Sequence, residues 1–286
     1  MRQGFGGFQL TPAVKNLLII NGLMYFATVS LVNVVDFNRL FALHLWFATD
    51  FYPHQFITHI FMHGSTMHLF MNMFTLWMFG TMLEQVWGTK RFLIYYMLTG
   101  IGAAFLYYGV DYWEIKNVYI PFDEAIANPT VENIRRFVAY VHGLDEMQKF
   151  IDFDMMDSYR NFRETYTNIM QNPDEASALS LQSAGAFAAK VKASYASGRS
   201  MLGASGAVFG ILLAFGMTFP NMKVMLLIPP IPMKAKYLVM FFAIFELYRG
   251  MANVPDDNVA HFAHLGGMVV GFIILRYWRS MGVGKR

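Results

Sequence analysis

Hydrophobic residues are gathered into six runs along the chain, and each run ends at charged residues or at Gly, Pro or Asn. The runs are residues 17–35, 67–86, 92–110, 201–219, 237–248 with its flanks, and 260–278. Most approach the roughly 20 residues that an α-helix needs to cross a hydrocarbon core of about 30 Å. None shows the alternation of a barrel strand. The pattern predicts an all-α membrane protein with six transmembrane helices, of which the fifth, short and containing Glu246, has the weakest pattern.

Polar residues are gathered as sharply as the apolar ones. Of the 41 Asp, Glu, Lys and Arg residues, 22 lie between Asp111 and Arg199, and 13 of these are acidic. The block is rich in helix formers, and its apolar residues recur at helical spacing, as at Met147, Ile151 and Met155. We interpret residues 111–199 as an insertion of three or four amphipathic helices between helices three and four. The chain then divides into 1–110 with an outer loop at 37–65, the insertion 111–199, and 200–286.

The overall composition agrees with a membrane protein and excludes several other classes. Hydrophobic residues make up 56% of the chain and charged residues 14%, whereas soluble domains have roughly 45–50% and about 25%. The absence of cysteine excludes disulfides, Cys-ligated zinc and a thiol nucleophile. A net charge of +3 is too small to favour nucleic acid as a partner.

The positions of Lys and Arg predict the orientation of the helices, because basic residues favour the cytoplasmic side. Eleven basic residues fall at alternate helix ends: Arg2, Lys15, Lys90, Arg91, Lys223, Lys234, Lys236, Arg276, Arg279, Lys285 and Arg286. The opposite short connections contain only Arg39 and Arg249. Since no cleavage site follows the first run, we expect it to be retained. Both termini are then cytoplasmic, and the 37–65 loop, the insertion and the loop at 253–258 lie outside.

The first segment with chemical potential is G-A-S-G-A-V-F-G, residues 203–210, at the outer end of helix four. Ser205 follows Ser200 by five residues, which would place it about 7–8 Å into the helix. A lone serine in a membrane helix usually bonds back to a carbonyl or holds helices together. Gly206 and Gly210 form a small face, which usually indicates close packing.

The second segment is A-H-L-G-G-M-V-V-G, residues 263–271, at the outer end of helix six. A histidine inside an apolar helix is costly unless it has a partner. Gly267 and Gly271 form a second small face, so helices four and six can approach, and His264 could take a proton from Ser205 during nucleophilic attack. No acidic residue lies in either helix, and Asp256 and Asp257 in the preceding loop are expected to be solvated.

These observations favour a Ser205–His264 dyad over a triad. The imidazole then needs another group to orient it, either Phe209, which lies one helical turn after Ser205 on the same face, or water.

The third segment is H-G-S-T-M-H-L-F-M-N, residues 63–72, at the outer end of helix two. His68 and Asn72 share a helix face and could, with the Ser205 amide, donate to a developing oxyanion. A metal site is the alternative, since histidines recur here at His54, His59, His63 and His68. Zinc hydrolysis would favour a carboxylate in the cluster, and residues 52–80 contain none.

These three segments, in this order on helices two, four and six, resemble the rhomboid intramembrane serine proteases. The resemblance covers the chain outside the polar block and implies a rhomboid-like bundle with its site open to the extracytoplasmic side. It implies Ser205 as nucleophile, His264 as base, and His68, Asn72 and the Ser205 amide as oxyanion hole. The supporting residues it implies are His63, structural; Gly203, keeping the cleft open; Phe209, stacking; and Gly206, Gly210, Gly267 and Gly271, packing helices four and six.

The function implied is that of a serine endopeptidase that cleaves single-span transmembrane proteins near their outer end, within the lipid bilayer and without cofactor or metal. The expected location is a bacterial inner membrane. The alternatives are a non-catalytic rhomboid-like binder of membrane proteins and, less favoured, a channel or transporter. We expect the insertion, which enters helix four just before Ser205, to help select or position substrates.

Three features depart from the family pattern. His54-Gln55 stands where many members have Trp-Arg in the outer loop, so this loop must be anchored differently. Phe209 stands in place of a tyrosine, which keeps the ring and removes the hydroxyl. The insertion replaces a connection that is usually short. None of the three removes a proposed catalytic group.

Overall fold

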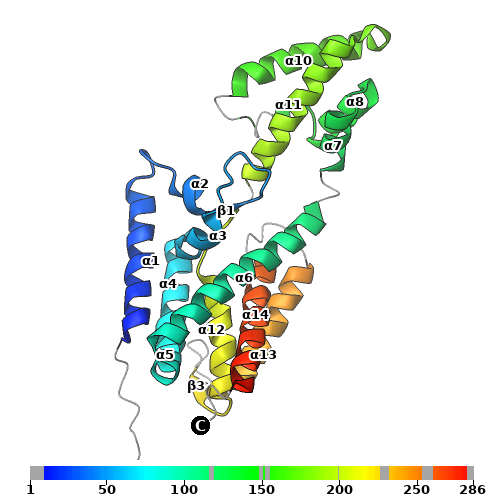
Figure 1. Ribbon diagram of the computed structural model, residues 1–286. Coiled ribbons are helices and arrows are strands. Elements are labelled where there is room, and N and C mark those ends of the chain that lie inside the picture. The colour runs from blue at the N-terminus through cyan, green and yellow to red at the C-terminus, as the bar shows by residue number, and fades with distance from the viewer. Residues whose placement is uncertain are drawn as a thin grey trace, which may run out of the picture. The chain divides into compact units, whose positions relative to one another are not determined.

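All six apolar runs form helices in the computed structural model, which describes residues 10–115, 119–147, 151, 155–198, 200–225, 232–252 and 260–281 (Figure 1). The second run is one helix whose middle turn widens to a π-helix. The helices are α1 (Pro12–Ser30), α4 (Thr66–Thr75) with η2 (Leu76–Gly80) and α5 (Thr81–Trp87), α6 (Thr89–Ile115), α12 (Ser205–Thr218), α13 (Ala235–Ala252) and α14 (His261–Ser280). Gly88, with φ of +80°, separates α5 from α6.

The connections contain short elements. The outer loop holds α2 (Phe37–Phe41), β1 (Leu43–His44), α3 (Gln55–Thr58) and η1 (His59–Phe61), and β1 belongs to a two-stranded sheet with β2 (Ser200–Met201). Between α12 and α13, β3 (Lys223–Met225) pairs antiparallel with β4 (Pro232–Lys234), with Lys223 opposite Lys234. The predicted outer loop at 253–258, with Asp256 and Asp257, lies outside the described residues, as do Arg2, Lys285 and Arg286.

The chain divides into two units. Unit 1 consists of Met1–Leu43, Pro53–Val110 and Met201–Arg286, and unit 2 of His44–Tyr52 and Asp111–Ser200. Part of the outer loop thus belongs to unit 2 together with the polar block, which the division by composition did not anticipate.

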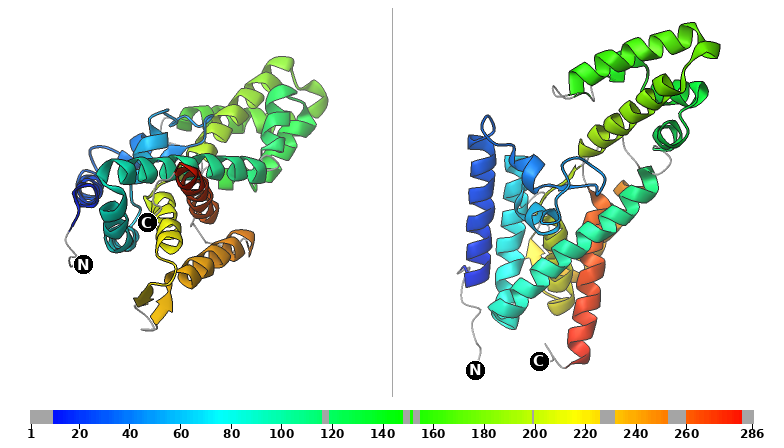
Figure 2. Two further views of the ribbon diagram at one scale, coloured as in Figure 1. Left: turned by 60° about the horizontal axis from the view of Figure 1, so that its bottom comes forward. Right: turned by 45° about the horizontal axis from the view of Figure 1, so that its top comes forward.

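In unit 1, α12 is the central helix. It contacts α14, α13, η2, α4 and α5, and nine of its fourteen residues are buried (Figures 1 and 2). Glycines let α6 cross it closely, since a Cβ on Gly206 would lie 2.5 Å from Cβ of Ala103, and one on Gly210 2.8 Å from Cβ of Thr99. The helix with the proposed nucleophile is therefore held on several sides.

The outer helices of unit 1 expose large apolar side chains. On α13, Phe241, Ile244 and Tyr248 are more than half exposed, and α1 and α14 have comparable faces. Soluble proteins rarely leave such surface uncovered, so these faces fit contact with lipid. Among the described helices, α1 and the Thr89–Trp113 part of α6 are long and apolar enough to cross a membrane, and α12 is apolar but shorter.

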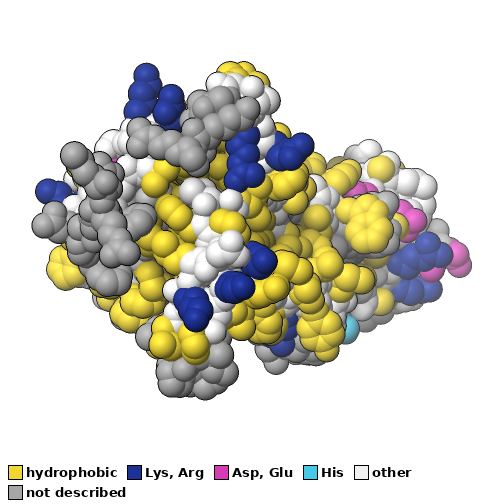
Figure 3. Space-filling view, turned by 90° about the horizontal axis from the view of Figure 1, so that it is seen from below, with side chains coloured by type: hydrophobic (Ala, Val, Ile, Leu, Met, Phe, Trp, Pro, Cys, Tyr) yellow, Lys and Arg dark blue, Asp and Glu magenta, His cyan; other side chains and the backbone are white. Residues whose placement is uncertain are grey.

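Basic side chains mark one end of unit 1. Seen from below, Lys and Arg side chains stand among hydrophobic ones (Figure 3). At this end lie the start of α6, the β3–β4 hairpin and the end of α14, which contribute Lys90, Arg91, Lys223, Lys234, Arg276 and Arg279.

Unit 2 is helical and has its own core. The helices are α7 (Ile120–Ala127), α8 (Val131–Tyr140), α9 (Leu144–Met147), α10 (Met156–Gln171) and α11 (Ala178–Ser197), with the 3-10 turn η5 (Pro173–Glu175). Thr130 and Ser177 cap α8 and α11 by accepting from backbone amides three residues on. Aromatic rings fill the centre, where Phe162 stacks on Phe187 with centroids 4.4 Å apart.

A buried carboxylate on α5 fastens the start of α1 to this helix. Glu84, 3% exposed, accepts from the backbone amides of Ala13 at 2.9 Å and Val14 at 3.0 Å. It also accepts from the hydroxyls of Thr11 at 2.5 Å and Thr89 at 2.7 Å. Since the first amides of a helix have no partner within it, Glu84 supplies from another helix the cap that α1 lacks.

We expect Glu84→Gln to lower the free energy of unfolding by about 1–3 kcal/mol, because the amide loses charge and one acceptor oxygen of this network. Thermal unfolding of the purified protein in detergent measures the effect. Thr28→Ala, which removes one hydroxyl that bonds within its own helix, is the control and should change the midpoint less. Equal midpoints for Glu84→Gln and wild type would contradict the assigned role.

Candidate active site

Ser205 stands at the first position of α12. The expectation that it lies five residues inside the helix is wrong, since Ser200 and Met201 form strand β2 and Gly203 has a φ of +126°. A residue with this φ cannot be part of an α-helix, and any residue with a side chain would be strained there. Because α12 begins at Ser205, the amide of Ser205 belongs to the first turn, whose N–H groups lack partners within the helix and carry the positive end of its dipole.

Ser205 and His264 are in hydrogen-bond contact. The distance from Ser205 Oγ to His264 Nε2 is 2.8 Å, and His264, on the first turn of α14, is 8% exposed. Phe209 stacks on the imidazole with ring centroids 4.3 Å apart and planes 7° apart. The two residues that the motifs suggested are thus brought together, and the ring expected to orient the histidine lies against it.

The glycines of the two motifs allow the helices to approach, one pair between α12 and α14 and the other pair against α6. A Cβ on Gly267 would overlap the carbonyl of Gly206, so these two glycines set the contact of α12 with α14. A Cβ on Gly210 or on Gly271 would instead meet side chains of α6: Thr99 for Gly210, and the Tyr95 hydroxyl for Gly271. Tyr95 also donates to the carbonyl of Gly210 at 2.8 Å.

His68 and Asn72 lie on one face of α4, a helix that contacts α12. A Cβ on Gly203 would lie 2.7 Å from Cε1 of His68 and 3.6 Å from Oγ of Ser205, so the imidazole covers the backbone just before the serine. Asn72 is 5% exposed, and its Nδ2 has no hydrogen-bond partner among the described residues. A buried donor without a partner costs stability, which suits a group that receives its acceptor from a ligand.

His63 supports this wall from the loop before α4. It is 2% exposed, and its ring meets that of His68 edge-on, with centroids 5.0 Å apart. Burial, with a smaller contribution from His68, lowers the pKa of His63 to about 4. Burial also lowers the pKa of His59, in η1, to about 4. Both imidazoles are therefore uncharged at neutral pH.

The outer loop is anchored by the residues that replace the familiar Trp-Arg pair. Gln55, fully buried, donates from Nε2 to the carbonyls of Arg39 at 3.2 Å and Leu40 at 3.4 Å. His54 Nε2 lies 2.9 Å from the carbonyl of Leu40. The loop reaches the nucleophile through η1, since the amide of Gly203 donates to the carbonyl of His59 at 2.9 Å.

Sequence reasoning missed two residues of the site, Glu246 and His261. Glu246, on α13, is 5% exposed, and its Oε2 lies 2.8 Å from Nδ1 of His264 and 2.6 Å from Nδ1 of His261. The imidazole of His264 therefore has an acidic neighbour, although α12 and α14 contain none. The signal was present, because an acidic residue within an apolar run is costly unless it is paired.

The same three side chains have the composition of a metal site. Within the described part of the chain, the ligand atoms of Glu246, His261 and His264 lie within 4.8 Å of one another. His54, His59, His63 and His68, considered from the sequence as an alternative metal site, form no such group among the described residues. Ligands of a tetrahedral zinc ion lie about 3.3 Å apart. The 2.6 and 2.8 Å contacts of Glu246 are shorter and are those of hydrogen bonds.

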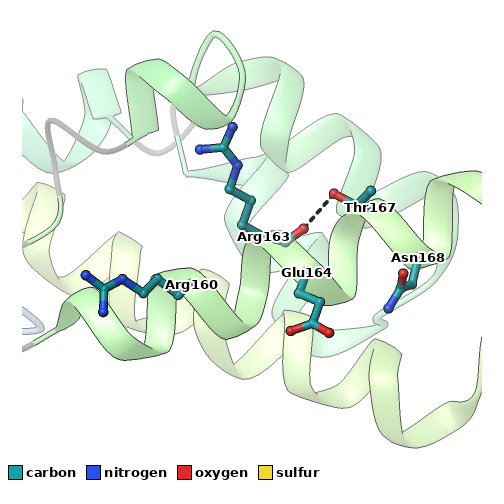
Figure 4. A pocket seen from close by; sticks show the side chains of 5 residues that line it. All are labelled: Arg160, Arg163, Glu164, Thr167 and Asn168. Atoms are coloured by element: carbon teal, nitrogen blue, oxygen red, sulfur yellow. Dashed lines mark hydrogen bonds between the residues drawn. The ribbon is translucent and has the colours of Figure 1, made fainter.

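A separate hollow lies on the insertion, along α10 (Figure 4). It is lined by Arg160, Arg163, Glu164, Thr167 and Asn168, and the Thr167 hydroxyl donates to the carbonyl of Arg163 at 2.8 Å. All five residues are exposed and belong to one helix. The hollow is thus a groove between side chains of a solvated helix face rather than an enclosed site.

Comparison with known families identifies the family to which this chain belongs. The family model described as Rhomboid domain matches residues 50–114 and 173–280. The matched segments include the three motifs and Glu246, while the unmatched residues 115–172 contain α7 to α10 of the insertion. No curated protein matches the chain. Since the matched residues make up more than half of its length, the protein belongs to the rhomboid family.

Proposed function

We propose that this protein is an intramembrane serine endopeptidase in which Ser205 is the nucleophile and His264 the general base. Rhomboid proteins are embedded in membranes and are mostly serine proteases, although some are inactive. The observation that supports activity here is the 2.8 Å contact between Ser205 Oγ and His264 Nε2. A hydroxyl paired with a base is the minimum arrangement for covalent acyl transfer.

The reaction follows from this contact. As Ser205 Oγ attacks the scissile carbonyl carbon, its proton passes to His264 Nε2, and the carbonyl oxygen becomes an oxyanion. The C–N bond then breaks, and His264 returns the proton to the leaving amine. In the second half, a water molecule gives a proton to His264 and attacks the acyl carbon. The carboxylic acid departs, and Oγ regains its proton.

The oxyanion is stabilised by donors that surround the start of α12. We assign this role to the amide of Ser205, the buried Nδ2 of Asn72, and the His68 imidazole that covers Gly203. Donors fixed in place before the reaction stabilise charge without reorganisation, which makes this kind of interaction a large contribution to catalysis. The unpartnered Asn72 amide supports the assignment.

The substrates that fit this site are single-span transmembrane proteins cut near their extracytoplasmic end. The apolar faces of α1, α13 and α14 support six spans in a bilayer, and the basic end seen in Figure 3 supports cytoplasmic termini. Ser205 and His264 start their helices at the opposite end, which would face outside. Helices hide their peptide bonds, so a segment with Gly or Pro is expected to be cut most readily.

Incubation of the purified protein in detergent with a single-span substrate and with a fluorophosphonate probe tests the proposal. Wild type is expected to cleave and to take up the probe at Ser205, located by mass spectrometry of the labelled peptide. Ser205→Ala is the control and should do neither. If wild type takes up no probe while an active serine hydrolase in the same detergent is labelled, the protein is the non-catalytic binder instead.

A further inference from the structure

We propose that Glu246 is a positioning residue for the reaction, which makes the expected dyad a three-residue chain from carboxylate through imidazole to hydroxyl. The inference rests on the proposed function, and it revises the sequence-based preference for a dyad, in which packing on Phe209 or water would orient His264. Three contacts carry it: Glu246 Oε2 to His264 Nδ1 at 2.8 Å, His264 Nε2 to Ser205 Oγ at 2.8 Å, and Glu246 Oε2 to His261 Nδ1 at 2.6 Å.

The first consequence concerns the tautomer of His264. An ionised carboxylate only accepts hydrogen bonds, so Nδ1 of His264 must carry the proton and donate to Glu246. A neutral imidazole carries one proton, which leaves Nε2 as the acceptor that faces Ser205. Stacking on Phe209 fixes the plane of the ring but is the same for either tautomer. Glu246 therefore supplies what Phe209 cannot.

The second consequence concerns charge. When His264 takes the proton of Ser205 it becomes an imidazolium, and the negative charge of Glu246 lies 2.8 Å from its Nδ1. The His264 and Glu246 side chains are only 10% and 7% exposed. Because water screens little at such a position, the attraction is stronger there than at a surface. The carboxylate thus stabilises the form of the histidine that exists only during the reaction.

His261 keeps the carboxylate in place. It lies one turn before His264 on α14, and its Nδ1 donates to the same Oε2 that His264 uses. A buried carboxylate without donors would be costly, and two imidazole donors offset that cost. Since both imidazoles use one oxygen, an amide oxygen at this position could accept from both rings. Glu246→Gln can therefore keep the tautomer and lose the charge, whereas Glu246→Ala loses both.

A structural role is the competing explanation, because Glu246 also ties α13 to α14. The two are separated by measuring kcat, KM and the thermal midpoint for wild type, Glu246→Gln, Glu246→Ala and Ser205→Ala. Glu84→Gln is the matched control. It alters another carboxylate that is buried among hydrogen-bond donors and that touches none of the site residues.

We expect kcat to fall about 10-fold in Glu246→Gln and about 100-fold in Glu246→Ala, with KM within about threefold. We expect smaller losses than in a site where a carboxylate is the only group that orients the imidazole, because Phe209 still stacks on His264 in both variants. Glu84→Gln should lower the midpoint and leave kcat of the folded protein unchanged. Wild-type kcat in both Glu246 variants, with Ser205→Ala inactive, would overturn this inference and leave the proposed function standing. The inference would also be overturned if the fraction of unfolded protein in each Glu246 variant accounted for its whole loss of kcat. An inactive wild type would overturn both.

Discussion

Replacement of His264 by Ala is expected to lower kcat for cleavage of a single-span substrate by about 10⁴- to 10⁶-fold. The imidazole is the acceptor for the Ser205 proton, at 2.8 Å, and the same atom must return that proton to the leaving amine. Among the described residues, Ser205 Oγ has no second base within hydrogen-bond distance. What activity is left must come from the oxyanion donors and from substrate binding.

The double variant makes this prediction sharper. Residues that act as one unit are strongly non-additive, so Ser205→Ala/His264→Ala should be no slower than either single variant. His142→Asn is the control, because His142 is exposed, lies in the insertion and has a φ of +59° that Asn tolerates. Rate constants are measured at substrate saturation with midpoints checked for folding. Additive losses in the double variant would show that Ser205 and His264 do not act together.

The sequence was sufficient for the helices and for the pair at the site, and the reason is physical. A polar residue in an apolar run is costly, so Ser205, His264, His68 and Asn72 stood out against their surroundings. Small residues spaced four apart on two runs indicated that those helices approach. They meet where any Cβ on Gly267 would overlap the carbonyl of Gly206. The local pattern thus indicated which helices approach one another, but not the depth of Ser205, which stands at the first position of α12.

Two features depended on tertiary structure and could not be predicted in this way. The contact of Glu246 with His264 requires α13 to lie beside α14 with one side chain at the right height, and helical periodicity does not specify this. The start of α12 depends on Gly203, two residues before Ser205. Its φ of +126° is not helical, so the helix cannot extend back through the first residues of the apolar run. Gly203 was predicted to keep the cleft open, but its backbone conformation was not.

The family pattern hid a third feature. In the outer loop, the absence of Trp-Arg indicated a different anchor without saying which. The answer is the side-chain amide of Gln55, which donates to the carbonyls of Arg39 and Leu40. A neutral amide can do this because its acceptors are backbone carbonyls, whereas a carboxylate partner would call for a cation. Such a solution depends on where residues 39–40 pass, which is a property of the folded loop.

Adding a single methyl group at Gly203 should also impair catalysis strongly. We expect Gly203→Ala to lower kcat/KM by about 10²- to 10³-fold. An alanine here is strained whatever space it has, at a cost of order 1–3 kcal/mol. Its Cβ would also lie 2.7 Å from Cε1 and 2.8 Å from Nε2 of His68. Either the imidazole or the backbone before Ser205 must move, and both belong to the proposed oxyanion hole.

The measurement is kcat/KM for a single-span substrate together with the rate of fluorophosphonate labelling at Ser205. Labelling should slow along with cleavage, because the probe also places a developing negative charge among the same donors. Gly109→Ala is the matched control, since a Cβ there meets nothing within 4 Å and the residue lies within helix α6. If Gly203→Ala folds with wild-type activity, the loop can relax without disturbing His68 or Ser205. The oxyanion site would then have to be built from other donors than the ones that meet at Gly203.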